Sequence, residues 1–424
     1  MNRSPKRIGF VATRLAGTDG VSLETAKWSR VLTDLGYECF YFAGESDWPE
    51  ARTYQVPEAH FEHPEIRRLN VDLFDDCVRS PDTSQAVQRL KDHLKWHLRE
   101  FVRRFDLNLL IAENVLSLPM NVPLGLALTE VISETELPTV AHHHDFSWER
   151  ERFAVNAAAD YLHAAFPPSL PAIRHVVINS FAASQLALRT GASSLLVPNV
   201  IDFETPPPLL DEYAAGLRAA LGIRPDDRLL LQPTRIVPRK RIQLAIELAH
   251  RLDERCALVI SHAAGDEGQA YENYLHHFAD MLNVRTIFAA SLINHGRGVD
   301  TDGRRIFSLA DVYQQADLIT YPSRVEGFGN AFLEAVYYRR PVVMSTYEIF
   351  KTDIEPKGFK VIGFGDFIGD ETVRAVRAVL HDPALAAEMA NHNFELGRRY
   401  YSWRTLEHRL VHLVGDCLGV ETTN

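Results

Sequence analysis

Short apolar runs alternate with segments of helical periodicity through the first half of the chain. Continuous apolar runs bounded by polar residues predict buried strands, and apolar positions three and four residues apart predict helices. The predicted strands cover residues 7–13, 38–43, 107–112, 139–142 and 176–179, and a helix is predicted at 21–35. Apolar strands separated by helices are typical of a parallel sheet covered on both faces.

This pattern breaks near residues 197–202 and restarts after three consecutive prolines at 206–208, which predicts a linker between two domains. Beyond the linker, the predicted strands cover residues 228–232, 256–261, 317–321 and 341–345, and the predicted helices 241–252 and 330–338. The sequence therefore predicts an α/β protein with two Rossmann-like, doubly wound domains and a cleft between them. Ligands of such sheets bind at the carboxyl ends of the strands, so the loops that follow strands are the candidate sites.

Composition narrows the class of protein. The chain has 424 residues and a formal net charge of −11, which argues against a nucleic-acid partner. Its four cysteines are scattered, with no Cys-x-x-Cys pair, so neither a disulfide framework nor a zinc site is expected. The first apolar run is too short for a signal peptide, and no run approaches the ~20 apolar residues of a membrane span. We therefore expect a cytoplasmic protein without membrane association.

A glycine-containing loop in the second half reads Pro322-Ser-Arg-Val-Glu-Gly-Phe-Gly-Asn-Ala-Phe-Leu-Glu-Ala335 and joins a predicted strand to a predicted helix. Its two glycines let the backbone approach a ligand, and the N–H groups at the helix start favour an anion. Glu326 can accept hydrogen bonds from sugar hydroxyls. Glu334 shares a helix face with Asn330, four residues earlier, and can bind a ribose diol. A solvated turn followed by a surface glutamate is the alternative, which the spacing of the two glutamates makes less favourable.

A second strand–loop–helix run reads Leu230-Leu-Gln-Pro-Thr-Arg-Ile-Val-Pro-Arg-Lys-Arg241. Arg235 and Lys240 flank a loop stiffened by Pro238. Two cations at a strand end suit a diphosphate, whose charge grows as it leaves. We expect Arg239 and Arg241 to point outward. Taken alone, a solvated basic turn is the more common explanation of such a run.

Together, the two loops resemble family 4 of the retaining GT-B glycosyltransferases, which includes sucrose-phosphate synthases and bacterial mannosyltransferases. Residues 197–202 resemble the interdomain Pro-Asn-Gly-Val-Asp segment of that family, and residues 402–410 resemble its C-terminal helix. The resemblance covers nearly the whole chain and implies a GT-B fold. We accordingly place the first, acceptor-side domain at 1–200, the nucleotide-sugar domain at 201–395, and a helix that crosses back to the first domain at 396–424.

The resemblance also implies roles for single residues. Arg235 and Lys240 would bind the donor diphosphate, Glu326 and the amides after it the donor hexose, and Glu334 the ribose. The predicted donor-binding set is Gly17, Gly20, Arg235, Lys240, Glu326, Gly327, Phe328, Gly329, Asn330 and Glu334. The predicted catalytic set is His144, Arg235, Lys240 and Glu326.

Three residues depart from the pattern of the family. Thr234 and Arg241 stand where glycine is usual, and Asn330 replaces a common aliphatic residue. The last change lies next to the expected phosphate and hexose positions, so the identity of the donor stays open.

The first domain offers a glycine-containing turn and a run of histidines. Gly17 and Gly20 follow the first strand, and their loop resembles the Gly-Gly loop whose amides meet the β-phosphate or the acceptor. Residues 142–144 are three histidines followed by Asp145. Neighbouring side chains on a strand point to opposite faces, so three consecutive imidazoles do not suit one metal ion, and we expect no metal.

In the family, a histidine at this strand end reaches the donor sugar. We assign that role to His144, with His143 as the alternative and Asp145 as the group that orients the ring. The charged run after Trp148 suits either a solvated helix start or an acceptor contact. The acceptor candidates are Asp19, Glu113, His143, Asp145 and Arg150.

Three other features carry less weight. Asp300-Thr-Asp302 matches a metal-binding signature of another glycosyltransferase fold but lies in a polar loop of the second domain, where chance explains it better. Residues 90–105 form a basic amphipathic helix that suits a membrane surface, although packing against the first sheet is the favoured interpretation. The Gly265-Asp-Glu-Gly268 turn follows a strand and could approach the nucleotide.

The sequence as a whole predicts a retaining glycosyltransferase that moves a hexose, glucose or mannose, from a nucleotide diphosphate sugar to a small soluble acceptor. No cofactor and no metal are expected. Related alternatives are a nucleotide-sugar 2-epimerase and a disaccharide phosphorylase of the same fold. The partners are the sugar nucleotide and the acceptor, and a homodimer is left open.

Overall fold

The computed structural model describes residues 6–17, 19–264, 269–294 and 296–419. The chain divides into two compact units. Unit 1 comprises residues 1–200 and 403–424, and unit 2 comprises residues 201–402. The helix α14 (Pro383–Tyr400) runs past residue 396, where the sequence predicts the start of the returning segment, and the chain re-enters unit 1 at Trp403.

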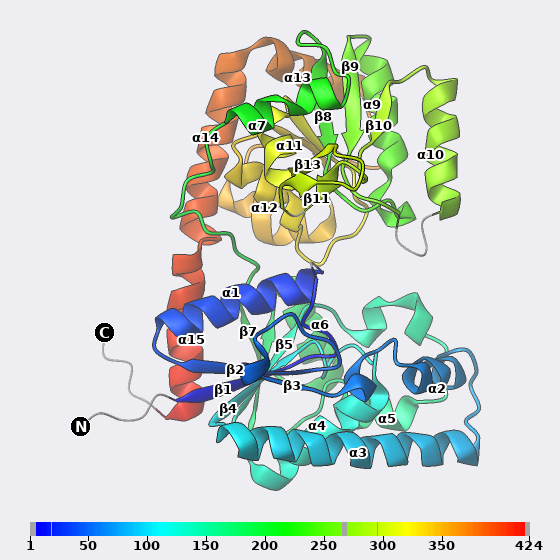
Figure 1. The fold of residues 1–424 in the computed structure, drawn as a ribbon, viewed down its shortest axis with the longest axis vertical. Helices are drawn as coiled ribbons and strands as arrows, with labels where there is room; N and C mark the ends of the chain where they lie inside the picture. The colour runs from blue at the N-terminus through cyan, green and yellow to red at the C-terminus, as the bar shows by residue number, and fades with distance from the viewer. Residues whose placement is uncertain (1–5, 18, 265–268, 295, 420–424) are drawn as a thin grey trace. The chain divides into compact units, whose positions relative to one another are not determined.

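Unit 1 is built on a seven-stranded sheet in the order β3-β2-β1-β4-β5-β6-β7, and its adjacent strands are parallel (Figure 1). The strands are β1 (Arg7–Val11), β2 (Glu38–Ala43), β3 (Thr53–Gln55), β4 (Leu109–Glu113), β5 (Thr139–His143), β6 (Ile173–Val177) and β7 (Ser194–Leu196). The order reverses between β1 and β4, as in doubly wound folds.

Successive strand residues of unit 1 contribute to two different cores. Ile8 and Phe10 pack with α1 (Gly20–Asp34) and α15 (Trp403–Leu418). Val11 and Leu110 pack with α3 (Pro81–Phe105) and α4 (Val122–Thr135). Figure 1 shows these helix pairs on opposite faces of the sheet. The apolar runs in the sequence arise because both faces of each strand are buried.

The returning helix α15 is part of the core of unit 1. Leu406 and Leu410 are fully buried against β1, β4 and α1. Leu410→Ala should therefore destabilise unit 1 by about 2–5 kcal/mol, since it removes buried methyl groups and leaves a cavity. All five tryptophans lie in unit 1, so urea denaturation followed by tryptophan fluorescence reports on it. Leu188, which is 81% exposed, supplies the control, and equal midpoints for Leu410→Ala and Leu188→Ala would refute this account.

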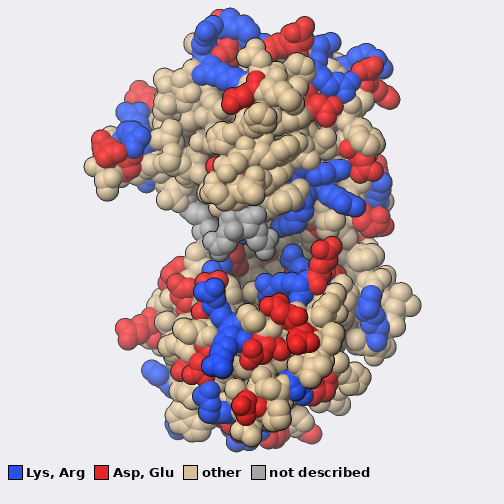
Figure 2. All heavy atoms as spheres, turned by 90° about the vertical axis from the view of Figure 1, so that its right-hand side faces the viewer, with Lys and Arg blue, Asp and Glu red and all other residues tan. Residues whose placement is uncertain are grey.

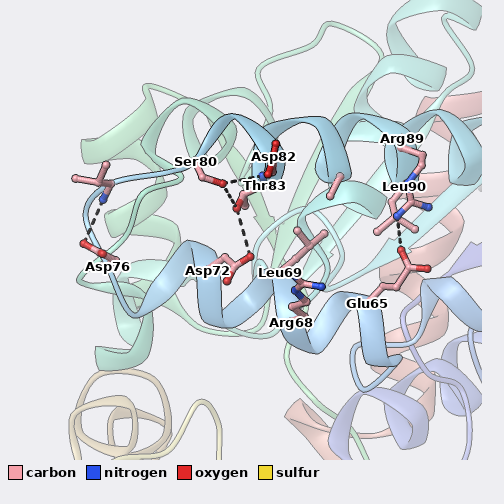
Figure 3. A pocket seen from close by; sticks show the side chains of 12 residues that line it. Glu65, Arg68, Leu69, Asp72, Asp76, Ser80, Asp82, Thr83, Arg89 and Leu90 are labelled. Carbon is pink, nitrogen blue, oxygen red and sulfur yellow. Dashed lines mark hydrogen bonds and ion pairs between the residues drawn. The ribbon is translucent and has the colours of Figure 1, made fainter.

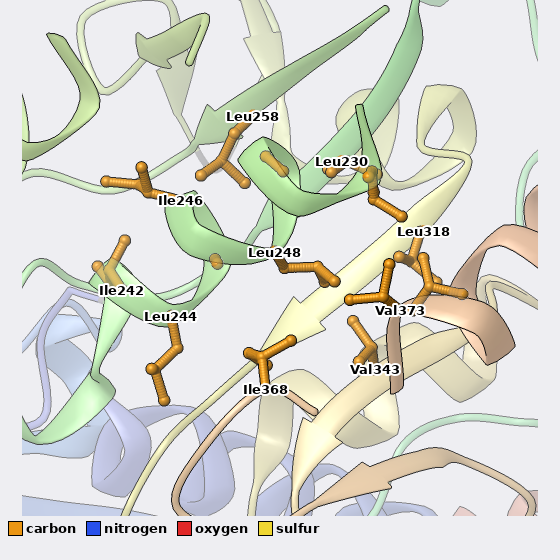
Figure 4. Packing of buried hydrophobic residues seen from close by; sticks show 14 of the residues in the cluster. Leu230, Ile242, Leu244, Ile246, Leu248, Leu258, Leu318, Val343, Ile368 and Val373 are labelled. Carbon is orange, nitrogen blue, oxygen red and sulfur yellow. The ribbon is translucent and has the colours of Figure 1, made fainter. Parts of the chain in front are cut away.

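Unit 2 repeats the architecture with a six-stranded parallel sheet in the order β10-β9-β8-β14-β15-β16. Its strands are β8 (Arg228–Gln232), β9 (Cys256–Ile260), β10 (Thr286–Phe288), β14 (Leu318–Tyr321), β15 (Val342–Ser345) and β16 (Ile362–Phe364). One face packs against α9 (Ile242–Leu252), α10 (Gln269–Met281) and α13 (Asp370–His381), where Leu248 meets Leu230, Leu318 and Val343 (Figure 4). The helices α11 (Leu309–Gln315) and α12 (Asn330–Tyr337) contact β8 and β14, respectively.

The remaining elements are short or peripheral. A small sheet joins β11 (Ile293–Asn294), β12 (Gly298–Val299) and β13 (Arg305–Ser308), and the other α-helices are α2 (Pro64–Phe74), α5 (Ala159–Ala165), α6 (Ser180–Thr190), α7 (Glu212–Ala215) and α8 (Leu217–Ala220). The fold class predicted from the sequence, two Rossmann-like α/β domains, is confirmed. The predicted strands and helices occur with ends within three residues.

The basic helix at residues 90–105 is the C-terminal part of α3 and packs against α4. Its cations are paired across that contact: Lys91 with Glu130, and Lys95 with both Glu130 and Glu134. Figure 2 likewise shows acidic side chains beside basic ones over unit 1, in the lower half of the view. Among the described residues, no helix is long and apolar enough to cross a membrane.

Candidate active site

In unit 2, the loops after β8 and β14 meet at the carboxyl ends of these two central strands of the sheet. The two strands are parallel neighbours, so their carboxyl ends lie side by side. This places Lys240, at the end of the first loop, against Glu326 in the second. The Lys240 ammonium donates a hydrogen bond to Oε1 of Glu326, although the residues are 86 positions apart in the sequence. Both side chains are almost fully buried, at 10% and 9% exposure.

The Glu326 carboxylate is paired with two cations, Lys240 and Arg239. Arg239 lies 3.5 Å from its Oε2 atom, and the Lys240 ammonium lies 5.5 Å from the centre of the Tyr321 ring. Burial disfavours the charged carboxylate, but Lys240 and Arg239 outweigh it and hold the pKa of Glu326 below its ordinary value. Glu326 is therefore an anion at neutral pH, and its carboxylate oxygens can accept hydrogen bonds.

The loop ends in the N-terminus of α12, which has no side-chain cap. Gly329 is the N-cap residue and has φ of +115°, a backbone conformation that L side chains rarely adopt. Tyr347 donates a hydrogen bond from its hydroxyl to the carbonyl of Phe328 at 2.7 Å and packs directly over Gly329. A helix start without a side-chain cap presents backbone N–H groups to an anion.

A side chain at position 329 should distort this loop. A Cβ atom there would lie 2.2 Å from the Tyr347 hydroxyl, and the positive φ adds strain. We expect Gly329→Ala to destabilise unit 2 by about 1–3 kcal/mol, measured as a lower melting temperature. Gly369 is the matched control, because an added Cβ atom there would meet nothing within 4 Å and φ is −87°. Equal melting temperatures for the two alanine variants would argue against a strained loop.

Glu334 lies one turn into α12, four residues after Asn330. The fully buried Tyr313 donates a hydrogen bond to its Oε2 atom at 2.8 Å. This contact fixes one side of the carboxylate. A fixed carboxylate on the first turns of the helix suits the predicted contact with a ribose.

Thr234 and Arg235 follow β8 after a single intervening residue, Pro233. Arg235 is exposed, whereas Thr234 is buried and accepts a hydrogen bond from the Gln232 amide at 2.7 Å. The other end of that amide accepts from Thr320 of β14 at 2.8 Å. The threonine at position 234 therefore has a structural explanation, because it ties the first loop to the neighbouring strand.

The expectation that Arg239 and Arg241 point outward was wrong. Arg239 contacts Glu326, and the Arg241 side chain is only 15% exposed. Arg241 has φ of +47°, in the left-handed region that favours glycine. Its guanidinium donates to the carbonyl of Pro322 at 3.0 Å and pairs with Asp366 at 3.1 Å. These bonds to the second loop offset the backbone strain of a non-glycine residue.

In unit 1, the turn after β1 places Gly17 with φ of +71°. Its N–H donates to the Asp47 carboxylate at 2.7 Å, so this amide binds an oxygen anion within the protein itself. Gly20 is the first residue of α1. Asp19 caps α1 by accepting from the amides of Val21 and Ser22, which gives it a structural role. Its predicted acceptor contact stays a prediction.

The three consecutive histidines separate onto two faces of the sheet. His143 is buried and lies 2.9 Å, Nε2 to Nδ1, from His175 of β6. His142 and His144 lie on the other face, where both contact Oε2 of Glu113 at the end of β4, at 2.9 Å and 3.1 Å. Only His144 is partly exposed, at 11%, so it is the better placed of the two candidates to meet a ligand in unit 1.

Asp145 does not orient His144, which corrects the sequence-based expectation. Its carboxylate accepts from the Asn114 amide at 2.9 Å and from Arg150. Asn114, with φ of +62°, also accepts the backbone N–H of His144 at 3.0 Å. The group that holds the His144 ring is Glu113, which the sequence alone placed among the acceptor contacts.

Two other predicted features lie elsewhere. Asp300 and Asp302 both pair with Arg304, so the Asp-x-Asp motif closes a turn. The Gly265–Gly268 turn lies outside the described residues.

A pocket of about 630 Å³ between α2 and α3 is lined by residues between 65 and 90, including Asp72, which accepts a hydrogen bond from Thr83 (Figure 3). None of its lining residues belongs to the loops described above.

Comparisons with known proteins identify the family and the fold. Residues 228–382 match the family model described as "Glycosyl transferases group 1". The chain is 32% identical to the mannosylglucosylglycerate synthase of Thermotoga maritima over 95% of this chain and 98% of that protein. It is also 32% identical to the enzyme of that name from Petrotoga mobilis, over 84% of this chain and 86% of that protein.

Among solved structures, sucrose-phosphate synthase from Thermosynechococcus elongatus matches with a TM-score of 0.69 and 14% identity, over 98% of this chain and 100% of that one. Anabaena HepE in complex with UDP and glucose matches with a TM-score of 0.68 and 13% identity, over 97% of this chain and 100% of that one. Fold and relatives together define a glycosyltransferase with the GT-B fold. The chain belongs to the group 1 glycosyltransferases.

Proposed function

We propose that this glycosyltransferase moves a hexose with retention from a nucleotide diphosphate sugar to a small soluble acceptor, and that it needs no metal ion. The observation that carries the proposal is the meeting of Lys240, Glu326 and the uncapped start of α12 at the carboxyl ends of β8 and β14. The site thus combines a carboxylate for hexose hydroxyls with cations and N–H groups for a diphosphate.

The relatives suggest the substrates. Two proteins 32% identical to the chain are named mannosylglucosylglycerate synthase. We infer that mannose is the favoured hexose and that the acceptor is a small glycoside of glycerate. Glucose as the donor sugar is the alternative.

In the mechanism that we propose, the acceptor hydroxyl attacks the anomeric carbon from the face that the diphosphate leaves. The leaving phosphate oxygen accepts the hydroxyl proton as the new glycosidic bond forms and the sugar–phosphate bond breaks. Arg235, Lys240 and the N–H groups of α12 stabilise the growing charge of the diphosphate, which is the work that a metal ion does in other enzymes.

Nucleotide release and product formation test this proposal together. The protein is incubated with GDP-, UDP- and ADP-linked glucose and mannose, with and without glucosylglycerate and other small acceptors, in the presence of EDTA. We expect acceptor-dependent release from one donor, a product heavier by one hexose in mass spectrometry, and an anomeric configuration by NMR that matches the donor.

Other outcomes separate the alternatives. Conversion of the donor to its 2-epimer without acceptor would identify an epimerase. Cleavage of a disaccharide that requires inorganic phosphate would identify a phosphorylase. Transfer that is lost in EDTA and restored by a divalent cation would contradict metal independence.

A further inference from the structure

Glu113 is the last residue of β4, at the carboxyl end of this central strand of unit 1, and is buried next to His144. Its Oε2 atom lies 3.1 Å from Nε2 of His144 and 2.9 Å from Nδ1 of His142. The register of β4 and β5 creates this cluster, because Glu113 pairs with His142 and His144 follows two residues later on the same face. Trp28 of α1 stacks on the His142 ring, with the two ring centroids 4.2 Å apart.

The two imidazoles have different surroundings. Burial lowers the pKa of His142, and its Nε2 atom is buried with no hydrogen-bond partner among the described residues. A neutral His142 ring that donates from Nδ1 to Glu113 fits these surroundings. His144 uses Nε2 for Glu113 and is the partly exposed member of the cluster. Within the described part of the chain, its Nδ1 atom has no hydrogen bond and is not among the buried unsatisfied atoms. His144 can therefore present Nδ1 to a ligand while Glu113 holds the opposite side of the ring.

The ligand atoms of Glu113, His142 and His144 lie within 4.8 Å of one another, a spacing that a metal ion could also bridge. The surroundings argue against this use. A metal-bound histidine almost always donates its other ring N–H to a carboxylate, a carbonyl or water. Nε2 of His142 is buried and has no carboxylate or carbonyl partner among the described residues. A carboxylate that accepts N–H groups from two imidazoles accounts for the cluster without an ion.

We propose that Glu113 is a positioning residue that fixes the ring of His144 and keeps it protonated, so that Nδ1–H is presented to an anionic or hydroxyl oxygen of the substrate. The proposal rests on the proposed transferase function for the identity of the substrate, but not for the state of the ring. In a transferase, a positively charged donor here would bind an oxygen of the sugar nucleotide or of the acceptor.

The charges that face His144 favour the protonated ring. Burial lowers the pKa of His144, but the hydrogen bond to Glu113 and the charges of Glu113, Glu24 and Asp145 outweigh it and raise that pKa above its ordinary value. Glu24 comes from α1 and is paired with Lys27, and Asp145 is paired with Arg150. Of the three carboxylates, Glu113 is the one in hydrogen-bond contact with the ring.

The test is an NMR titration of His144 in the whole chain, with the resonance assigned through His144→Gln. In Glu113→Gln the carboxylate is lost but the shape is kept, and we expect His144 to titrate about 1–3 pH units lower than in the wild type. Glu113→Asp, which keeps the charge but withdraws it by one methylene group, should give a smaller downward shift. If Glu113→Gln does not fold, the titration of His144 in Glu113→Asp tests the proposal in its place.

The pH profile of transfer provides the functional readout. Activity that needs protonated His144 is present below the pKa of His144 and falls as pH rises through it. The alkaline limb of kcat/KM should therefore move to lower pH in Glu113→Gln by the same amount as the NMR shift.

An unmoved His144 resonance in Glu113→Gln overturns the proposal, whether or not transfer is found. One equivalent of metal in the wild type that is lost in the variant also overturns it and assigns the cluster to an ion. If the resonance shifts but no transfer is detected with any donor, the proposed function fails and the positioning role of Glu113 stands.

Discussion

Glu326→Ala should abolish measurable transfer and leave the affinity for the free nucleotide nearly intact. The carboxylate is the charged acceptor in the loop after β14, and we assign it to the hydroxyls of the donor hexose, which a free nucleotide lacks. Losing a charged hydrogen-bond partner that acts in the transition state is expected to cost about 10²–10³-fold or more in kcat. Turnover and nucleotide binding, the latter by calorimetry, are measured on the same preparation.

The alanine substitution should also destabilise the fold, and Glu326→Gln separates this effect from the loss of transfer. Alanine leaves the Lys240 ammonium buried without its partner, and breaking a buried ion pair in this way costs about 3–5 kcal/mol. Glu326→Gln keeps the shape and a hydrogen-bond acceptor, so it should fold more stably than the alanine variant and still transfer slowly. If the folded glutamine variant loses nucleotide affinity as well, the assignment of Glu326 to the hexose is wrong.

The fold could be predicted because buried parallel strands give long apolar runs. For this reason the strands that the sequence predicts at residues 38–43 and 228–232 have the same bounds in the structure. The strands that were missed are short, such as β3 at Thr53–Gln55, β7 at Ser194–Leu196 and β16 at Ile362–Phe364. Three residues are too few to establish a period, and edge strands bury less of their surface.

The identity of the candidate residues could be predicted better than their partners. The sequence predicts both Lys240 and Glu326 as site residues. Their ion pair depends on β8 lying next to β14, which local sequence does not specify. The period of a strand predicts that His142 and His144 share a face and that His143 lies on the other. The carboxylate behind them comes from the register of β4 against β5, so the role of Glu113 could be found only in the structure.

Arg235→Ala should lower kcat about 100-fold, the usual effect of removing one preorganised donor at a developing charge. Arg235 is exposed in the loop after β8, so its loss should leave the melting temperature unchanged, unlike changes at the buried Lys240. Arg224, an exposed arginine before β8 and therefore at the opposite end of the strand, is the matched control. Arg224→Ala should turn over at the wild-type rate. Wild-type turnover in a folded Arg235→Ala variant would remove Arg235 from the diphosphate site and leave Lys240 and the α12 amides to stabilise the leaving group.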